Sequence, residues 1–238
     1  MARILIVGDN LSGEGMWQFF KDHHEVSTLN IWAAEKEEPT WFNYVMICET
    51  ALTKNCGLTK KPKIEDFRCD TVLIEDAMRC CHAGLFIIAS PVEPGTTDRL
   101  KALTGQRIVH IGCEPGGFLF GGSPEDTKEA VDLFASIAKD KYRYLQTDAR
   151  TCEMFKYSKT VFESVQHELM QKIKDVSTLG GIDFNQLREA WIVIGQTDPM
   201  KLISGPVQRD IMNNFIAYAK AVGCNVELLN IMKGNANA

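Results

Sequence analysis

Short apolar runs alternate with helical stretches through the first 145 residues, and no other feature of the sequence limits the fold as strongly. The runs have the length of β-strands and lie at residues 3–7, 24–29, 44–48, 85–89 and 107–111. Stretches with helical spacing separate them, at residues 16–22, 71–81 and 97–103. A further helix is expected to begin after Ser123, which is followed by a proline and two acidic residues. The alternation predicts an α/β fold with a doubly wound, mostly parallel sheet.

The sequence changes character after residue 147. Helical spacing continues from residue 148 to about 176 and returns at 183–194 and 207–222, without a run that has the pattern of a strand. At 238 residues, the chain is long enough for one large domain with a smaller one attached. We therefore expect a Rossmann-like α/β domain over residues 1–147 and a helical domain over residues 148–238.

Charge and composition argue against several classes of protein. The net charge is −5 and the 26 lysine and arginine residues are scattered, so no nucleic-acid partner is expected. The most apolar run, 85–89, is far shorter than the roughly 20 residues of a membrane helix. The first residues lack the pattern of a signal peptide, so we expect a cytoplasmic protein without membrane association. Eight cysteines without a C-x-x-C pair and five histidines without ligand spacing predict reduced thiols and no metal site.

The first apolar run ends in an incomplete dinucleotide-binding fingerprint. Such a fingerprint needs glycines because the backbone must turn tightly and approach a pyrophosphate at the start of a helix. Gly8 and Gly13 occupy the first and third glycine positions, whereas Asn10 stands at the second. Asn30 stands where an acidic residue would bind the ribose hydroxyls. The spacing alone is compatible with dinucleotide binding and equally with a structural turn that has lost its ligand.

Four motifs in a fixed order carry a resemblance to a known family. They are Tyr44-Val-Met-Ile-Cys-Glu-Thr50, Ser90-Pro-Val-Glu-Pro-Gly-Thr-Thr97, Cys152-Glu-Met-Phe-Lys-Tyr157 and Gln208-Arg-Asp210. Together with the glycine turn, they cover nearly the whole chain. In this order they resemble the UDP-glucose/GDP-mannose dehydrogenase family.

The resemblance implies a fold, a cofactor and a reaction. In that family an NAD-binding Rossmann-like domain precedes a helical domain that dimerises through its long helix, which corresponds here to residues 149–176. A further domain, expected to be missing here, completes the nucleotide-sugar site. The family oxidises a sugar alcohol to a carboxylate in two hydride transfers, and a cysteine captures the intermediate aldehyde. The residues expected to contact NAD are Gly8, Asn10, Gly13, Asn30, Thr50 and Thr97.

Several catalytic positions of the family are changed in this sequence. The nucleophilic cysteine is replaced by Pro206, and Pro91 stands in place of a threonine that positions water and substrate. Glu114 is the only candidate for the family's catalytic glutamates. The oxyanion-binding asparagine is replaced by Thr160.

The residues left to carry catalysis are Lys156 and Asp210, with Thr160 at the asparagine position. Each of the first two also has a structural explanation. Lys156 is compatible with a solvated residue that stabilises a long helix. Asp210 lies in the first turn of an expected helix, where the helix dipole favours a carboxylate.

Three functions therefore stay open. The first is a truncated relative that retains an NAD-type scaffold and a dimerising helix but does not complete C6 oxidation. The second is an active NAD-dependent oxidoreductase on a nucleotide sugar, which makes one hydride transfer with Lys156 as electrostatic stabiliser and without a covalent thiol. The third is a homodimer that binds a partner and has abandoned nucleotides. The basic segment 52–63 is a candidate loop over a ligand.

Overall fold

The computed structural model describes residues 1–8, 11–29, 41–48, 71–193, 206–221 and 223. The described residues form two compact units. The first unit contains the described parts of residues 1–156 and holds the sheet, and the second contains the described residues from Tyr157 onward. Helix α5 (Ala149–Leu179) begins in the first unit and continues into the second.

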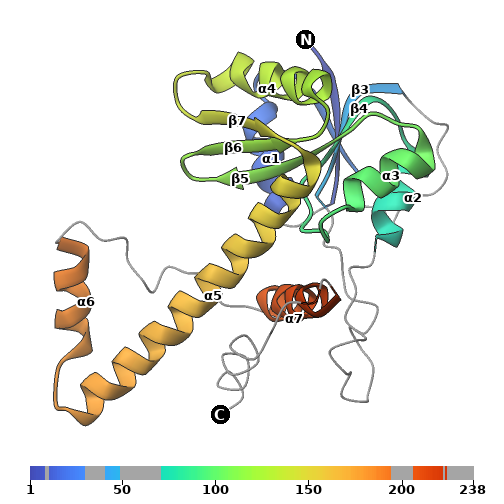
Figure 1. Cartoon of the computed structure of the whole chain (residues 1–238). Helices are drawn as coiled ribbons and strands as arrows, with labels where there is room; N and C mark the ends of the chain where they lie inside the picture. Colours follow the sequence, from blue (N-terminus) through green and yellow to red (C-terminus); the bar gives the residue numbers. More distant parts are fainter. Residues whose placement is uncertain (9–10, 30–40, 49–70, 194–205, 222, 224–238) are drawn as a thin grey trace. The chain divides into compact units, whose positions relative to one another are not determined.

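The first unit is built on a seven-stranded sheet with the order β2-β1-β3-β4-β5-β6-β7. The strands are β1 (Arg3–Val7), β2 (Glu25–Leu29), β3 (Trp41–Ile47), β4 (His82–Ile88), β5 (Ile108–Glu114), β6 (Gly117–Gly121) and β7 (Arg143–Thr147). The first five strands are parallel, β6 runs antiparallel to β5, and β7 is parallel to β6. The predicted α/β fold with a mostly parallel sheet is confirmed (Figure 1).

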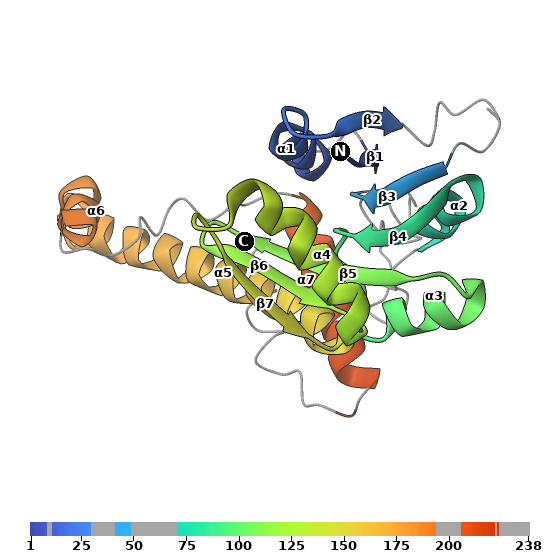
Figure 2. The ribbon, with the colours of Figure 1, turned by 90° about the horizontal axis from the view of Figure 1, so that it is seen from above.

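Helices cover both faces of this sheet because the central strands are apolar on both sides. Ile4 and Ile6 of β1 pack with α1 (Leu11–Phe20) and α4 (Pro124–Ala138). Leu5 and Val7, which point to the opposite face, pack with α2 (Val72–Cys80) and α3 (Thr96–Thr104). The result is a three-layer arrangement, and Figure 2 shows α1 and α4 on one side of the central strands and α2 and α3 on the other.

The last two strands of the sheet are absent from the sequence prediction. β6 is a short Gly-Phe-Leu-Phe-Gly segment, and β7 is half exposed, so neither has the long apolar run of the central strands. The predicted start of α4 is confirmed, since the Ser123 hydroxyl accepts a hydrogen bond from the Asp126 backbone amide. Proline follows at the first helical position.

The described residues of the second unit lie mainly in helices, as the helical spacing after residue 147 predicts. It contains the greater part of α5, together with α6 (Phe184–Val193) and α7 (Pro206–Ala221). Val161 of α5 packs with Ile216 and Ala219 of α7, and the rings of Tyr157 and Phe215 lie 6.3 Å apart in an edge-on arrangement. Among the described residues, no helix has the length and apolar character needed to span a bilayer.

Candidate functional site

The sheet topology has its switch point at the carboxyl ends of β1 and β3. After β1 the chain adds β2 on one side, then crosses to add β3 on the other side. In an open α/β sheet this change of direction opens a space at the carboxyl edge, where ligands bind. Gly8 directly follows β1 and Cys48 directly follows β3. The two strand ends are joined by a hydrogen bond from the Cys48 amide to the Val7 carbonyl, 2.8 Å long.

Both glycines of the fingerprint that lie in described ranges are required by the local geometry. Gly8 has a φ angle of 115°, which side chains rarely permit. A Cβ atom on Gly13 would lie 2.2 Å from the Gly8 carbonyl oxygen, so α1 approaches the end of β1 closely only because residue 13 is glycine. A Cβ atom on Gly15, two positions further along α1, would meet no atom within 4 Å. The amino end of α1 is therefore held against the strand, as a dinucleotide-binding turn requires.

The segment between β4 and α3 borders the same edge and is held by a buried carboxylate. Glu153, in the first turns of α5, accepts hydrogen bonds from the backbone amides of Gly95 (2.5 Å) and Thr97 (2.7 Å). Burial raises the pKa of Glu153, and these hydrogen bonds oppose that effect. Because amides at the start of α3 are already bound by Glu153, that helix end is occupied by one of the protein's own carboxyl groups.

Lys156 lies one turn further along α5, beside the end of β4. Its ammonium group donates a hydrogen bond to the backbone carbonyl of Ala89, the residue that follows β4. The predicted catalytic lysine is therefore located at the carboxyl edge of the sheet. This position is compatible with a role toward a ligand at that edge.

A buried histidine and a buried cysteine join β5 to the same region. His110 of β5 has Nε2 2.9 Å from the Ser90 carbonyl oxygen and Nδ1 3.4 Å from the sulfur of Cys152. Burial and the charge of Lys156 lower the pKa of His110 to about 3, so the imidazole is neutral. Neither residue carries a pattern in the sequence that points to the other, because 42 positions separate them.

The thiols near Lys156 are poor nucleophiles. Burial raises the pKa of Cys152 to about 12 and that of Cys113 to about 11. A thiol needs its thiolate form to attack a carbonyl, so neither cysteine is suited to form a covalent intermediate. The five cysteines in the described ranges form no disulfide with one another. Glu114 ends β5 and pairs with Gly117 of β6 in a tight hairpin.

Of the remaining predicted site residues, the structure describes the side chain of Thr97. Thr97 is only 1% exposed and its hydroxyl oxygen is buried without a hydrogen-bond partner among the described residues. Thr160 belongs to α5 and Asp210 to α7, but their side chains lie outside the described part. Asn10, Asn30, Thr50 and the segment 52–63 also lie outside the described ranges. Their roles stay predictions.

Sequence reasoning missed three side chains that organise this edge: Glu153, His110 and Cys152. Glu153 and Cys152 lie in the Cys152–Tyr157 motif, in which the resemblance points only to Lys156. No pattern in the sequence marks Glu153 as buried, because its partners Gly95 and Thr97 lie 58 and 56 positions away. His110 sits in an apolar run, where a polar residue must find a partner.

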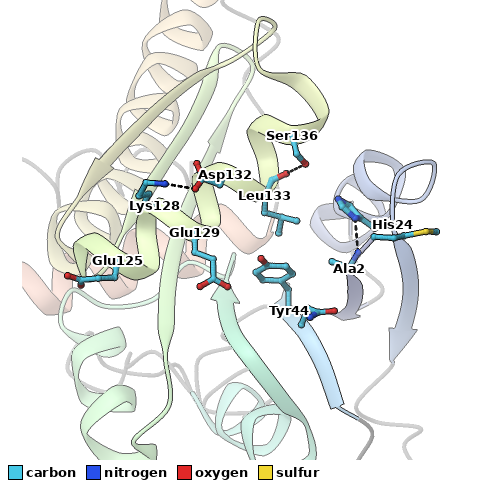
Figure 3. A pocket seen from close by; sticks show the side chains of 11 residues that line it. Ala2, His24, Tyr44, Glu125, Lys128, Glu129, Asp132, Leu133 and Ser136 are labelled. Carbon is cyan, nitrogen blue, oxygen red and sulfur yellow. Dashed lines mark hydrogen bonds and ion pairs between the residues drawn. The ribbon is translucent and has the colours of Figure 1, made fainter.

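A pocket of about 640 Å³ lies at the opposite, amino-terminal edge of the sheet, between α4 and the start of β1 (Figure 3). Its lining includes Tyr44, His24 and the side chains of α4 that face them. Asp132 is paired with Lys128 at 2.6 Å, Glu129 is paired with Arg107 at 2.6 Å, and His24 Nδ1 accepts from the Ala2 amide. These charges are already satisfied within the protein, and the pocket is separate from the glycine turn.

The fold and the site together define a structural class, in which a Rossmann-like α/β unit with a glycine turn at its switch point is followed by a helical unit. Solved structures of dehydrogenases share this fold. A UDP-glucose dehydrogenase from Pyrobaculum islandicum aligns with a TM-score of 0.72 and 15% identity over 100% of this chain and 67% of that chain. A UDP-D-ManNAc dehydrogenase from Pyrococcus horikoshii aligns with a TM-score of 0.70 and 18% identity over 99% and 68%.

A third similar structure is smaller. The 3-hydroxyisobutyrate dehydrogenase from Mycobacterium tuberculosis aligns with a TM-score of 0.65 and 13% identity over 100% of this chain and 93% of that chain. No protein-family model matches the sequence, and no curated protein matches it significantly. At these identities the similarity establishes a shared fold.

Proposed function

We propose that the protein binds NAD at the carboxyl edge of its sheet and is a nucleotide-sugar dehydrogenase-like scaffold that does not complete C6 oxidation. The observation that carries this proposal is the close approach of Gly13 to the Gly8 carbonyl at the switch point. It brings the amino end of α1 to the place where a pyrophosphate would be bound. The dehydrogenases of similar fold support the same cofactor class.

Two residues predict that the affinity for NAD is modest. Asn10 carries a side chain at the second glycine position, where a side chain would crowd the phosphates. Glu14 is an exposed acidic residue in the first turn of α1, where its charge opposes an anion. Replacing Asn10 with glycine is expected to tighten NAD binding. Unchanged binding would mean that the turn is not the phosphate site.

Lys156 is the residue proposed to act on a substrate. NAD, when bound, supplies the hydride acceptor. The Lys156 ammonium, held beside Ala89, would stabilise negative charge that develops on a substrate oxygen at this edge. Loss of the sulfur at Pro206 and the protonated state of Cys113 and Cys152 argue against a covalent thiohemiacetal. They favour the second candidate, a single hydride transfer that needs no thiol.

We also propose a homodimer formed through the long helix, residues 149–176. The described part of the second unit exposes several large apolar side chains, and Phe162 of α5 is 61% exposed. Exposed apolar residues of this size on one helical unit are typical of a protein interface. The third candidate, a non-catalytic homodimer that binds a partner, rests on the same observation and on the changed fingerprint.

Thermal unfolding with added ligand separates these candidates. A ligand that binds only the folded protein raises the melting temperature. A rise with NAD or NADH supports the cofactor proposal, and a further rise with UDP-glucose supports a nucleotide-sugar substrate. Oxidation of a nucleotide sugar with NADH formation would establish the second candidate. No shift with any of the three at millimolar concentration would leave the non-catalytic homodimer.

A further inference from the structure

A fixed hydrogen-bond chain connects His110 to the strand end that anchors Lys156. The Ser90 carbonyl can only accept, so the hydrogen that it receives at 2.9 Å must be on Nε2 of His110. With a neutral imidazole, Nδ1 is then left as an acceptor. The tautomer of His110 is thus set by the backbone of Ser90.

Cys152 completes the surroundings of the ring from α5. Its sulfur lies 3.4 Å from His110 Nδ1, 3.5 Å from the His110 carbonyl and 3.3 Å from the Leu119 carbonyl. All three are acceptors, so the sulfur is a thiol that donates its single hydrogen among them. Both side chains are fully buried. The ring is therefore held from β4 on one side and from α5 on the other.

The same two elements also hold Lys156. Cys152 and Lys156 are four residues apart and lie on one face of α5. Lys156 and His110, which Cys152 contacts, reach adjacent residues of the segment after β4. Lys156 donates to the Ala89 carbonyl, and His110 donates to the Ser90 carbonyl. Glu153 contacts the following turn at Gly95 and Thr97. Displacement of the 89–90 peptide would therefore displace the acceptor of the Lys156 ammonium.

We propose that His110 is a positioning residue for Lys156, acting through the Ser90 and Ala89 carbonyls and locked by the Cys152 thiol. This inference deepens the proposed function, since it assigns a support to the lysine on which that function rests. A buried neutral histidine has one donor nitrogen and one acceptor nitrogen, and each of them needs a partner. Here both ring nitrogens have partners, and both partners adjoin the Lys156 site.

The test measures the reactivity of Lys156 toward an amine-acylating reagent, followed by mass spectrometry of the peptide that contains it, without any cofactor. In His110→Phe, which removes both ring contacts, the rate at Lys156 is expected to rise about tenfold, the factor for one lost hydrogen bond. His110→Gln retains an amide donor for the Ser90 carbonyl and should stay close to the wild-type rate. Lys101 and Lys128 are internal controls, since neither contacts this chain of bonds.

The outcomes decide the proposal. An unchanged rate at Lys156 in folded His110→Phe overturns it, and so does an equal rise at Lys101 and Lys128, which would indicate general loosening. If His110→Phe does not fold, ¹⁵N chemical shifts of the His110 ring in the wild-type protein decide instead. Hydrogen on Nδ1 rather than Nε2 would overturn the proposal. Failure of NADH to bind the wild-type protein would remove the proposed function alone, because the labelling uses no cofactor.

Discussion

The backbone amide of Thr97 donates a 2.7 Å hydrogen bond to the Glu153 carboxylate, across 56 positions of sequence. This bond and its partner at Gly95 join the start of α3 to the start of α5. A single buried acid therefore ties the turn before α3 to the first turns of α5. The same helix supplies Lys156 one turn later.

Removal of this acid is expected to destabilise the fold. Glu153→Ala leaves two amides without their acceptor, which costs about 2 kcal/mol or more of unfolding free energy. Glu153→Gln keeps one acceptor oxygen and buries a neutral group, so its loss should be smaller. Urea unfolding measures both variants. Equal stability of Glu153→Ala and wild type would contradict the role of this carboxylate.

Replacing each of the two glycines of α1 with alanine should change the stability of the protein in opposite directions. Gly13→Ala places a Cβ atom 2.2 Å from the Gly8 carbonyl and is expected to cost about 2 kcal/mol or more of stability. Gly15→Ala meets no atom within 4 Å and should stabilise the helix by up to about 1 kcal/mol. Denaturant midpoints of the two variants test the prediction, and similar effects of both would argue against the close approach of helix and strand.

His110 predicts a pH dependence of stability. Its pKa is about 3 in the folded protein against 6.5 for the unperturbed side chain, so below pH 6.5 the unfolded chain binds a proton that the folded protein does not. Stability is therefore lost as pH falls from 6.5 toward 3, by up to about 1.4 kcal/mol per pH unit from this residue. In His110→Gln, the free energy of unfolding should fall less steeply between pH 6 and pH 4, by up to that amount per pH unit. Identical slopes would show that His110 titrates normally.

The proposed dimer is tested at Phe162. Its side chain is 61% exposed, so Phe162→Asp should produce monomers in sedimentation experiments with little effect on the fold. Phe155 is a poorer probe, because its ring packs against Gly112, where a Cβ atom would lie 3.1 Å from Cδ1. A charge at Phe155 is expected to destabilise the first unit. Dimers that persist in Phe162→Asp would exclude this residue from the interface.

Local sequence determined most elements of the fold, with β6 and β7 as the exceptions. The apolar runs at 3–7 and 85–89 can only be buried on both faces, and they became central strands. The pattern after residue 147 predicts three helices, and the described residues contain three. Ser123 and Pro124 set the start of α4. These features depend on neighbours a few positions apart, which periodicity and capping report directly.

Tertiary structure alone decided which polar side chains meet. Glu153 finds its amides, and His110 finds Ser90 and Cys152, only because α5 packs against the ends of β4 and β5. Such pairings depend on how elements distant in sequence are placed, and no local spacing encodes them. The neutral state of His110 follows from the same cause, because burial and the nearby Lys156 charge exist only in the folded chain.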